Sequence, residues 1–377
     1  MSGRSRRPPP AERILITALL PIGDTLFLTP SLHALRAVYP RAQLTALVYP
    51  SNAGILINNP DVDEIRHYPT RHGWPGIGTA LGLARDLRRR RYDLTVEFSA
   101  YNAWIAAWAG VRRRSFLPLS AVWWADPFVG RPLRRYHAVQ VYAQVVQQLG
   151  IPIRDWRLRM APTPADTARA AALRARYGIQ PGEQMIGIHV GGEGLWGRKR
   201  WAPANFAAVA EALTRRAGGK VVVLGGREEA DLAADVARRA QSPVFNLAGQ
   251  TTLGETAAMA AACALFIGND SSPLHIAAAM GTPVVGIYGP TSPRSYHPWV
   301  PGAVPGRDYA LVLGHAPCAG QFTLGGSKPL AAYLQAMLCR ALETIRPVEV
   351  LDAALGLLAA RAATPVTAGA GLVPAEL

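Results

Sequence analysis

Only three cysteines occur among the 377 residues, and their odd number and wide spacing argue against a disulfide framework. We expect Cys263, Cys318 and Cys339 to be reduced thiols of a cytoplasmic protein. No pair of Cys or His has the spacing of a zinc site. Charged residues are also scarce, at 17% against 50% hydrophobic residues, which excludes a chain that stays disordered.

Long hydrophobic runs are absent as well. A membrane-spanning helix needs roughly 18 consecutive apolar residues, and no uninterrupted stretch reaches that length. An arginine-rich start followed by the apolar residues 14–19 resembles a secretory signal, but Pro21, Gly23 and Asp24 interrupt it. We therefore interpret residues 1–13 as a disordered tail and residues 14–19 as a buried strand. Any membrane contact is then peripheral.

Positive charge is concentrated in one half of the chain. Residues 1–180 contain 25 Lys and Arg against 11 Asp and Glu, a net charge of +14, whereas residues 181–377 contain 15 against 14, a net charge of +1. Such an uneven distribution suggests that one domain meets a polyanion and the other does not. Nucleic acid, an anionic membrane surface and a phosphorylated glycolipid are the candidates, and an arginine-rich surface without a partner is the alternative.

Short β-branched runs alternate with helical patterns almost from end to end, which is typical of parallel sheets with crossover helices. Turn signals around residues 160–183 divide this alternation, so we expect two doubly wound α/β domains. Such domains bind ligands at the carboxyl ends of their strands, and two facing each other would enclose a cleft. The strands are expected at residues 14–19, 43–48, 64–68 and 93–98, and then at 185–190, 220–224, 264–268, 283–288 and 309–313.

The domain boundaries follow from the same patterns. We expect the first domain at residues 14–165, a connection at 166–182 and the second domain at 183–345. Residues 346–377 are expected to form a C-terminal helix and a frayed tail.

The first candidate site is the turn Pro21-Ile22-Gly23-Asp24-Thr25, where the first strand feeds a helix expected at residues 25–38. Asp24 is either a cap of that helix or a functional carboxylate. The turn contains one glycine instead of Gly-x-Gly-x-x-Gly, which argues against a dinucleotide oxidoreductase.

The second candidate site follows the first strand of the second domain and has the sequence Gly191-Gly192-Glu193-Gly194-Leu195-Trp196-Gly197-Arg198-Lys199-Arg200-Trp201. Glycines let backbone amides approach a phosphate closely, and a lysine supplies a point charge. No Walker loop is present, because Gly-Lys-Ser/Thr is missing. A mobile basic loop without a ligand is the alternative.

The third candidate site is the run Gly268-Asn269-Asp270-Ser271-Ser272-Pro273-Leu274-His275. Pro273 suits a first helical turn, and the free amides at a helix start form an anion site. A carboxylate beside a phosphate is tolerable if hydroxyls, amides or a cation neutralise it, so Asp270 needs such a partner. His275 is as well explained as a packed helix residue as it is as a ligand contact.

Together these three segments resemble glycosyltransferase family 9, the ADP-heptose:lipopolysaccharide heptosyltransferases. That family has a Gly-Asp turn before a Pro-x-Leu-x-Ala-Leu-Arg helix, then a Lys-x-Trp-x-Pro element, and then Asp-Ser/Thr-Gly-Pro-x-His-x-Ala-Ala-Ala followed by Gly-Thr-Pro and Gly-Pro-Thr. The resemblance covers roughly residues 12–350. It departs from the family at Ser272, where glycine is usual. The matching positions are Asp24, Lys199, Asp270, His275 and Thr291.

The resemblance implies a GT-B fold, with two Rossmann-like domains facing a cleft, and an inverting transfer of heptose from ADP-heptose to lipopolysaccharide inner core. It implies that Asp24 is the general base and that the acceptor, at the inner leaflet of the inner membrane, binds the first domain. The donor would bind the second domain through Gly191, Gly192, Lys199, Arg200, Asp270, Ser271, Ser272, His275 and Thr291. Acceptor-binding candidates are Gly23, Arg112, Arg113 and Arg114.

This chemistry requires no cofactor and no metal, Mg²⁺ included. The sequence offers no Asp-x-Asp metal turn, since Asp61-Val62-Asp63 precedes a strand instead of following one. One alternative keeps the fold but uses another nucleotide-sugar donor or another anionic glycan acceptor. A second alternative, of a different class, is a nucleic-acid-binding protein that uses the basic half. We find no nucleic-acid-binding motif that would support it and expect no nucleic-acid partner.

Overall fold

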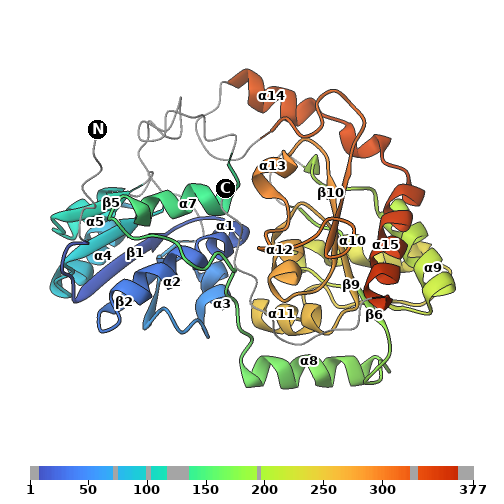
Figure 1. Ribbon diagram of the computed structural model, residues 1–377, viewed down its shortest axis with the longest axis horizontal. Coiled ribbons are helices and arrows are strands. Elements are labelled where there is room, and N and C mark those ends of the chain that lie inside the picture. The colour runs from blue at the N-terminus through green and yellow to red at the C-terminus, as the bar shows by residue number, and fades with distance from the viewer. Residues whose placement is uncertain are drawn as a thin grey trace. The chain divides into compact units, whose positions relative to one another are not determined.

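The computed structural model describes residues 8–70, 75–98, 103–116, 136–192, 197–322 and 330–363. The chain divides into two compact units, Met1–Ala161 and Pro162–Leu377. Each unit is built on a parallel sheet, as the strand–helix alternation predicts (Figure 1).

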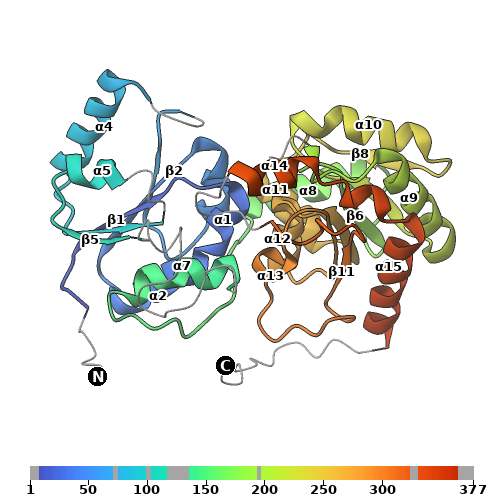
Figure 2. The same cartoon turned by 90° about the horizontal axis from the view of Figure 1, so that it is seen from above.

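Unit 1 contains a five-stranded sheet in the order β3-β2-β1-β4-β5. Its central strand β1 carries apolar residues toward both faces, and Ile14, Leu15 and Ile16 are fully buried, as a parallel sheet covered on both sides requires. Figure 2 shows α4 and α5 on one side of this sheet and α2 and α7 on the other. The elements are β1 (Arg13–Ala18), α1 (Ile22–Phe27), α2 (Thr29–Val38), β2 (Gln43–Val48), η1 (Pro50–Asn52), α3 (Ala53–Leu56), β3 (Glu64–His67), α4 (Ile77–Arg89), β4 (Leu94–Glu97), α5 (Ala103–Trp108), β5 (Arg113–Phe116) and α7 (Ala138–Gln147).

Unit 2 contains a six-stranded sheet in the order β11-β10-β9-β6-β7-β8. In Figure 1, α9 and α15 lie on one side of its strands and α11 and α12 on the other. The elements are α8 (Pro164–Arg176), β6 (Met185–His189), α9 (Pro203–Ala217), β7 (Lys220–Val223), η5 (Arg227–Glu229), α10 (Ala230–Arg239), β8 (Val244–Asn246), α11 (Leu253–Ala261), β9 (Leu265–Asn269), α12 (Ser272–Ala279), β10 (Val284–Tyr288), α13 (Pro293–Tyr296), β11 (Tyr309–Leu313), α14 (Leu330–Leu338), η6 (Ala341–Thr344) and α15 (Pro347–Ala362).

The strand orders locate a switch point in each sheet. In unit 1 the chain moves from β1 to β2 and β3 on one side and then returns to β4 on the other side of β1. In unit 2 it moves from β6 to β7 and β8 and returns to β9 beside β6. Doubly wound sheets bind ligands outside the carboxyl ends of the two strands at this point. The relevant edges are therefore those after β1 and β4 and after β6 and β9.

Several local features differ from the sequence-based expectation. The helix expected at residues 25–38 is two helices, because Pro30 lacks an amide hydrogen and a new helix begins at Thr29. The connection at residues 166–182, which we expect to hold a helix between its turn signals, does contain one, α8, but this helix belongs to unit 2, where it contacts α11. Part of the expected N-terminal tail is held in place, since the Pro9 carbonyl accepts a hydrogen bond from Tyr39. Residues 1–7 and 364–377 lie outside the described part of the chain.

The expectation of three reduced cysteines is wrong for two of them. Cys318, after β11, and Cys339, after α14, form a disulfide with their Cα atoms 5.7 Å apart, and only Cys263 is a free, buried thiol. Both segments lie against the turn that follows β10, because the Gly320 amide donates to the Gly289 carbonyl and a Cβ on Gly289 would lie 2.7 Å from Leu342 Cγ. Sequence spacing alone does not reveal a contact made by tertiary folding.

Candidate functional site

Asp24 lies at the switch point of the unit 1 sheet. It is the third residue of α1, which is separated from the end of β1 by three residues. The residue that precedes the helix is Pro21, so Asp24 does not occupy the N-cap position that the sequence allowed. Its carboxylate is half-buried and stands in the first helical turn, where the helix dipole favours negative charge.

A buried asparagine fixes the turn that carries Asp24. The Asn52 Nδ2 donates hydrogen bonds to the Leu20 carbonyl at 2.6 Å and to the Thr25 hydroxyl at 2.9 Å. The Thr25 hydroxyl in turn donates to the Pro21 carbonyl at 3.1 Å. Both ends of the turn are therefore held by the segment that follows β2.

Tyr142 is a site residue that the sequence analysis misses. Its hydroxyl donates a hydrogen bond of 2.9 Å to Asp24 Oδ1. In the sequence, Tyr142 contributes only to the apolar periodicity of a helix, now α7, and nothing near it in the chain points to Asp24. The two residues are 118 positions apart in the chain, which explains why no local pattern reveals the contact.

The structure does not bring the predicted acceptor arginines to Asp24. Arg113 begins the edge strand β5 and pairs with Leu94, the first residue of β4, so Arg112 and Arg113 stand at the amino end of the sheet, opposite Asp24. Arg114 donates two hydrogen bonds to the buried Glu97 carboxylate, at 2.7 and 2.9 Å, and is thus part of an internal ion pair. Of the predicted acceptor residues, only Gly23 adjoins Asp24.

In unit 2 the structure brings together three of the predicted donor-binding residues. The Lys199 ammonium lies 2.8 Å from Asp270 Oδ2, and His275 Nε2 lies 3.4 Å from Asp270 Oδ1. All three side chains are buried. Burial opposes ionisation of this carboxylate, but Lys199 and His275 outweigh it, so the pKa of Asp270 lies well below its usual value. The cation that Asp270 needs is therefore Lys199, and His275 contacts Asp270.

The glycines of the second candidate site allow close packing. A Cβ on Gly191 would lie 2.4 Å from Glu229 Cγ, so the backbone can approach the η5 segment only without a side chain. The Arg200 Nε donates a hydrogen bond of 3.1 Å to the Gly192 carbonyl, and this bond joins the two ends of the loop. Residues 193–196 lie outside the described part of the chain.

Asn269 connects this loop to the third candidate site, and the sequence analysis did not assign it a role. Its Nδ2 donates to the carbonyls of Val190 and Gly191, and its Oδ1 accepts from the Trp201 amide at 3.1 Å. The side chain is fully buried. An amide can donate and accept at once, so this one residue ties the end of β6, the basic loop and the end of β9 together.

The remaining predicted residues surround the start of α12 and the turn after β10. Ser272 is the first residue of α12, and the Ser271 hydroxyl donates to the Asn269 carbonyl instead of capping the helix. The turn that carries Thr291 adjoins the basic loop, because a Cβ on Gly289 would lie 3.3 Å from the Arg198 carbonyl oxygen. The buried Thr291 hydroxyl has no hydrogen-bond partner among the residues that the structure describes.

These features gather groups that favour negative charge at the switch point of the unit 2 sheet. The Lys199 ammonium, the Arg200 guanidinium and the positive end of the α12 dipole are these groups. Within the described ranges, no group of three or more His, Cys, Asp or Glu side chains could hold a metal ion.

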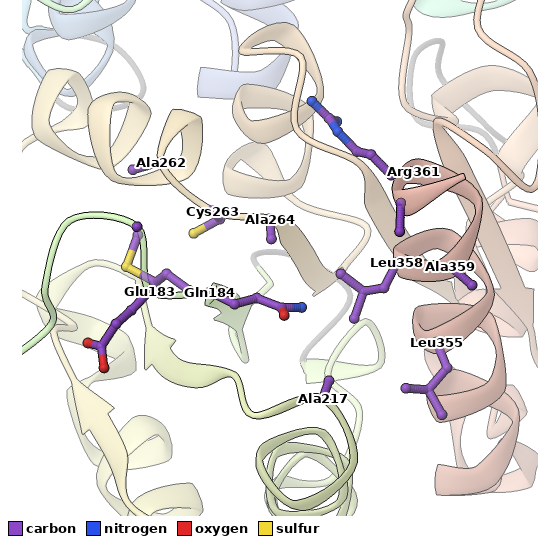
Figure 3. Close-up of a pocket in the computed structure, with 13 residues that line it drawn as sticks. Glu183, Gln184, Ala217, Ala262, Cys263, Ala264, Leu355, Leu358, Ala359 and Arg361 are labelled. Atoms are coloured by element: carbon purple, nitrogen blue, oxygen red, sulfur yellow. The ribbon is translucent and has the colours of Figure 1, made fainter. Parts of the chain in front are cut away.

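A pocket of about 670 Å³ lies at the opposite, amino end of the same sheet (Figure 3). Its lining comes from the segments before β6 and β9, with Glu183, Gln184 and Ala264, and from Leu355 and Leu358 of α15. None of the predicted donor-binding residues lines it, so this pocket is separate from the candidate site.

Comparison with known proteins agrees with this geometry. The model of glycosyltransferase family 9 (heptosyltransferase) matches residues 80–311. Lipopolysaccharide heptosyltransferase 3 of Escherichia coli is 29% identical over 290 residues, covering 74% of this chain and 83% of that protein. Lipopolysaccharide heptosyltransferase 2 of Salmonella typhimurium is 27% identical over 301 residues, covering 74% and 84%.

Two solved structures share the fold. The family 9 glycosyltransferase of Veillonella parvula superposes with a TM-score of 0.76 at 22% identity, covering 92% of this chain and 97% of that chain. The ADP-heptose lipopolysaccharide heptosyltransferase II of E. coli gives 0.69 at 22% identity, covering 93% and 100%. The predicted GT-B fold is thereby confirmed, and the chain belongs to glycosyltransferase family 9.

Proposed function

We propose that this glycosyltransferase transfers heptose from ADP-heptose to a lipopolysaccharide-type acceptor, with inversion at the anomeric carbon. The lipopolysaccharide heptosyltransferases among its relatives support this choice of donor and acceptor. The observation that carries the proposal is the buried group of Lys199, Asp270 and His275 at the unit 2 switch point. Family membership does not favour the nucleic-acid alternative.

The donor diphosphate binds beside Lys199 in this proposal. The ammonium, Arg200 and the amides at the start of α12 stabilise the negative charge that develops on the departing ADP, which is the usual role of preorganised donors in group transfer. Asp270 holds Lys199 in place through their ion pair. Because these groups supply the positive charge, we propose that the reaction needs neither a metal nor a cofactor.

Asp24 is the general base in this proposal. Its carboxylate takes the proton of the acceptor hydroxyl as the hydroxyl oxygen forms a bond to the anomeric carbon. The bond from that carbon to the diphosphate breaks at the same time, and ADP leaves with the electron pair. The half-buried position of Asp24 in the first turn of α1 and its contact with Tyr142 support this assignment.

A panel of nucleotides tests the donor. Ligands that bind the folded state raise the melting temperature, so ADP and ADP-heptose should stabilise the enzyme more than UDP, GDP or their sugars. The same panel repeated with EDTA should give the same order. A larger shift with UDP- or GDP-sugars would replace ADP-heptose by the other donor and leave the family assignment intact.

We also propose that basic residues of unit 1 attract the acceptor and the anionic surface that carries it, at the cytoplasmic face of the inner membrane. No helix in the described part of the chain is long and apolar enough to cross a membrane. The last turn of α4 presents Arg88 and Arg89, both exposed. They precede β4 and so stand, like Arg112 and Arg113, at the amino end of the sheet, where in this proposal they attract the anionic surface and do not bind the reacting hydroxyl. The residues Arg131, Arg134 and Arg135, also basic, lie outside the described residues.

Replacing Arg88 and Arg89 by serine should raise the acceptor KM and flatten its dependence on salt. Each basic residue near an anionic surface contributes about 1 kcal/mol, so the pair should change KM roughly tenfold or more at low salt. The matched control is the pair Arg238 and Arg239, which ends α10 in the nearly neutral unit 2 and is paired with Asp235. An equal effect of both double variants would remove α4 from acceptor binding.

A further inference from the structure

The hydroxyl of Tyr142 and the carboxylate of Asp24 form a contact whose geometry is fixed from several sides. The two groups are 2.9 Å apart. The Tyr142 ring packs edge-on against Phe98, which follows β4, with the ring centroids 6.1 Å apart. At the start of α7 the His137 ring packs edge-on against Phe27 of α1, at 5.1 Å, so the helices that carry the two groups are joined at a second point.

We propose that Tyr142 is a positioning residue for the transfer reaction, which holds the Asp24 carboxylate in a fixed orientation and in its ionised form. The inference rests on the proposed role of Asp24 as general base. Nothing in the pattern of the sequence assigns this role to Tyr142, because its place in the chain marks it only as part of an amphipathic helix.

The physical reason is the direction of the hydrogen bond. A phenol that donates to a carboxylate stabilises the charged form and lowers the pKa of the acid. A base with a lower pKa stays ionised at a lower pH, and a carboxylate with one oxygen engaged has less freedom to rotate away from the hydroxyl that it must deprotonate. The tyrosine thus acts through Asp24 and does not need to contact the substrate.

Other titratable groups on the elements packed against α1 have partners of their own. The helix contacts α2, α3, η1 and α7. On α2, His33 lies 3.1 Å from Asp61 and Arg36 is paired with Asp63. The His137 Nδ1 at the start of α7 accepts a hydrogen bond from the Val139 amide. The experiments below therefore test the contact between Tyr142 and Asp24.

The variant Tyr142→Phe removes the hydroxyl and keeps the ring that packs on Phe98. Without the donated hydrogen bond the pKa of Asp24 rises, so the acid limb of the pH profile of kcat/KM should move up by about one pH unit. Below that limb, the variant should be roughly tenfold slower than the wild type at the same pH. Affinity for ADP and the melting temperature should hardly change. The matched control is Tyr39→Phe, which removes a hydroxyl that donates to the Pro9 carbonyl in the same unit and should leave the pH profile unchanged.

A double variant separates the two ways in which the inference can fail. If Tyr142 acts through Asp24, then Asp24→Asn combined with Tyr142→Phe should be no slower than Asp24→Asn alone. A pH profile of Tyr142→Phe that superposes on that of the wild type, with Asp24→Asn inactive, would overturn the role of Tyr142 and leave the base assignment standing. Near-normal turnover of Asp24→Asn would instead overturn the base, and the role of Tyr142 with it.

Discussion

Asp24→Asn should lower turnover by at least about a hundredfold while the enzyme stays folded and keeps its donor affinity, because loss of a general base costs roughly 10²–10⁴ in rate. The amide has almost the same shape as the carboxylate, and its oxygen can still accept the hydrogen bond from Tyr142. What it loses is the ability to take a proton. Steady-state kinetics, a melting curve and ADP calorimetry on one preparation test all three statements.

A matched control is Asp86→Asn, on the exposed side of α4 in the same unit, where the carboxylate pairs with Arg66. Surface pairs of this kind contribute little, so that variant should keep normal turnover. An Asp24→Asn enzyme with near-normal turnover and normal melting would assign Asp24 to structure. The base would then have to be sought elsewhere.

The fold could be predicted from the sequence because buried parallel strands leave a strong pattern. Runs such as Gln43–Val48 and Tyr309–Leu313 lie where the sequence predicts strands. Weakly apolar edge strands leave no such pattern, and β5, with the sequence Arg-Arg-Ser-Phe, is an example. Helices cover an edge strand less completely than a central one, so fewer of its residues need to be apolar.

The grouping of Lys199 and Asp270 could be predicted from local patterns, although the two residues are far apart in the chain, and their contact with the donor stays a prediction. Lys199 follows one strand of the switch point and Asp270 follows the other, and each lies in a recognisable turn. Tyr142 and Asn269 could not be found in this way. Neither residue stands in a pattern that marks a chemical role, and their contacts, with residues 118 and 68 or more positions away, appear only in the folded chain.

Lys199→Met should weaken ADP binding by about 1.5–3 kcal/mol, the range for hydrogen bonds to charged groups, which is roughly a 12- to 150-fold change in Kd. Methionine keeps most of the length of the side chain and removes its charge. The control is Lys220→Met at the start of β7, where the ammonium lies 3.8 Å from Glu183 in a half-exposed pair, and this change should leave Kd unaltered. Unchanged ADP affinity by calorimetry in the Lys199 variant would remove that residue from the donor site.

The same substitution should also destabilise the fold, because it leaves the buried Asp270 without its cation. Breaking a buried ion pair from one side costs about 3–5 kcal/mol. In the wild type the pKa of Asp270 is lowered, so the pair contributes stability at neutral pH that is lost as the pH falls through the acid range. Without Lys199 the buried carboxylate gains a proton more readily, so the stability difference between variant and wild type should shrink as the pH falls. A difference independent of pH would argue against Asp270 as its source.

Adding Asp270→Asn to Lys199→Met separates the two effects of the lysine. Removing both charges leaves no uncompensated ion in the interior, so the free energy of unfolding should recover in part, as it does when a buried pair is replaced as a whole. The affinity for ADP should not recover, because the ammonium that we propose to bind the diphosphate is still missing. If instead affinity returns together with stability, then Lys199 serves to neutralise Asp270, and the charge that binds the donor comes from Arg200 and the amides at the start of α12.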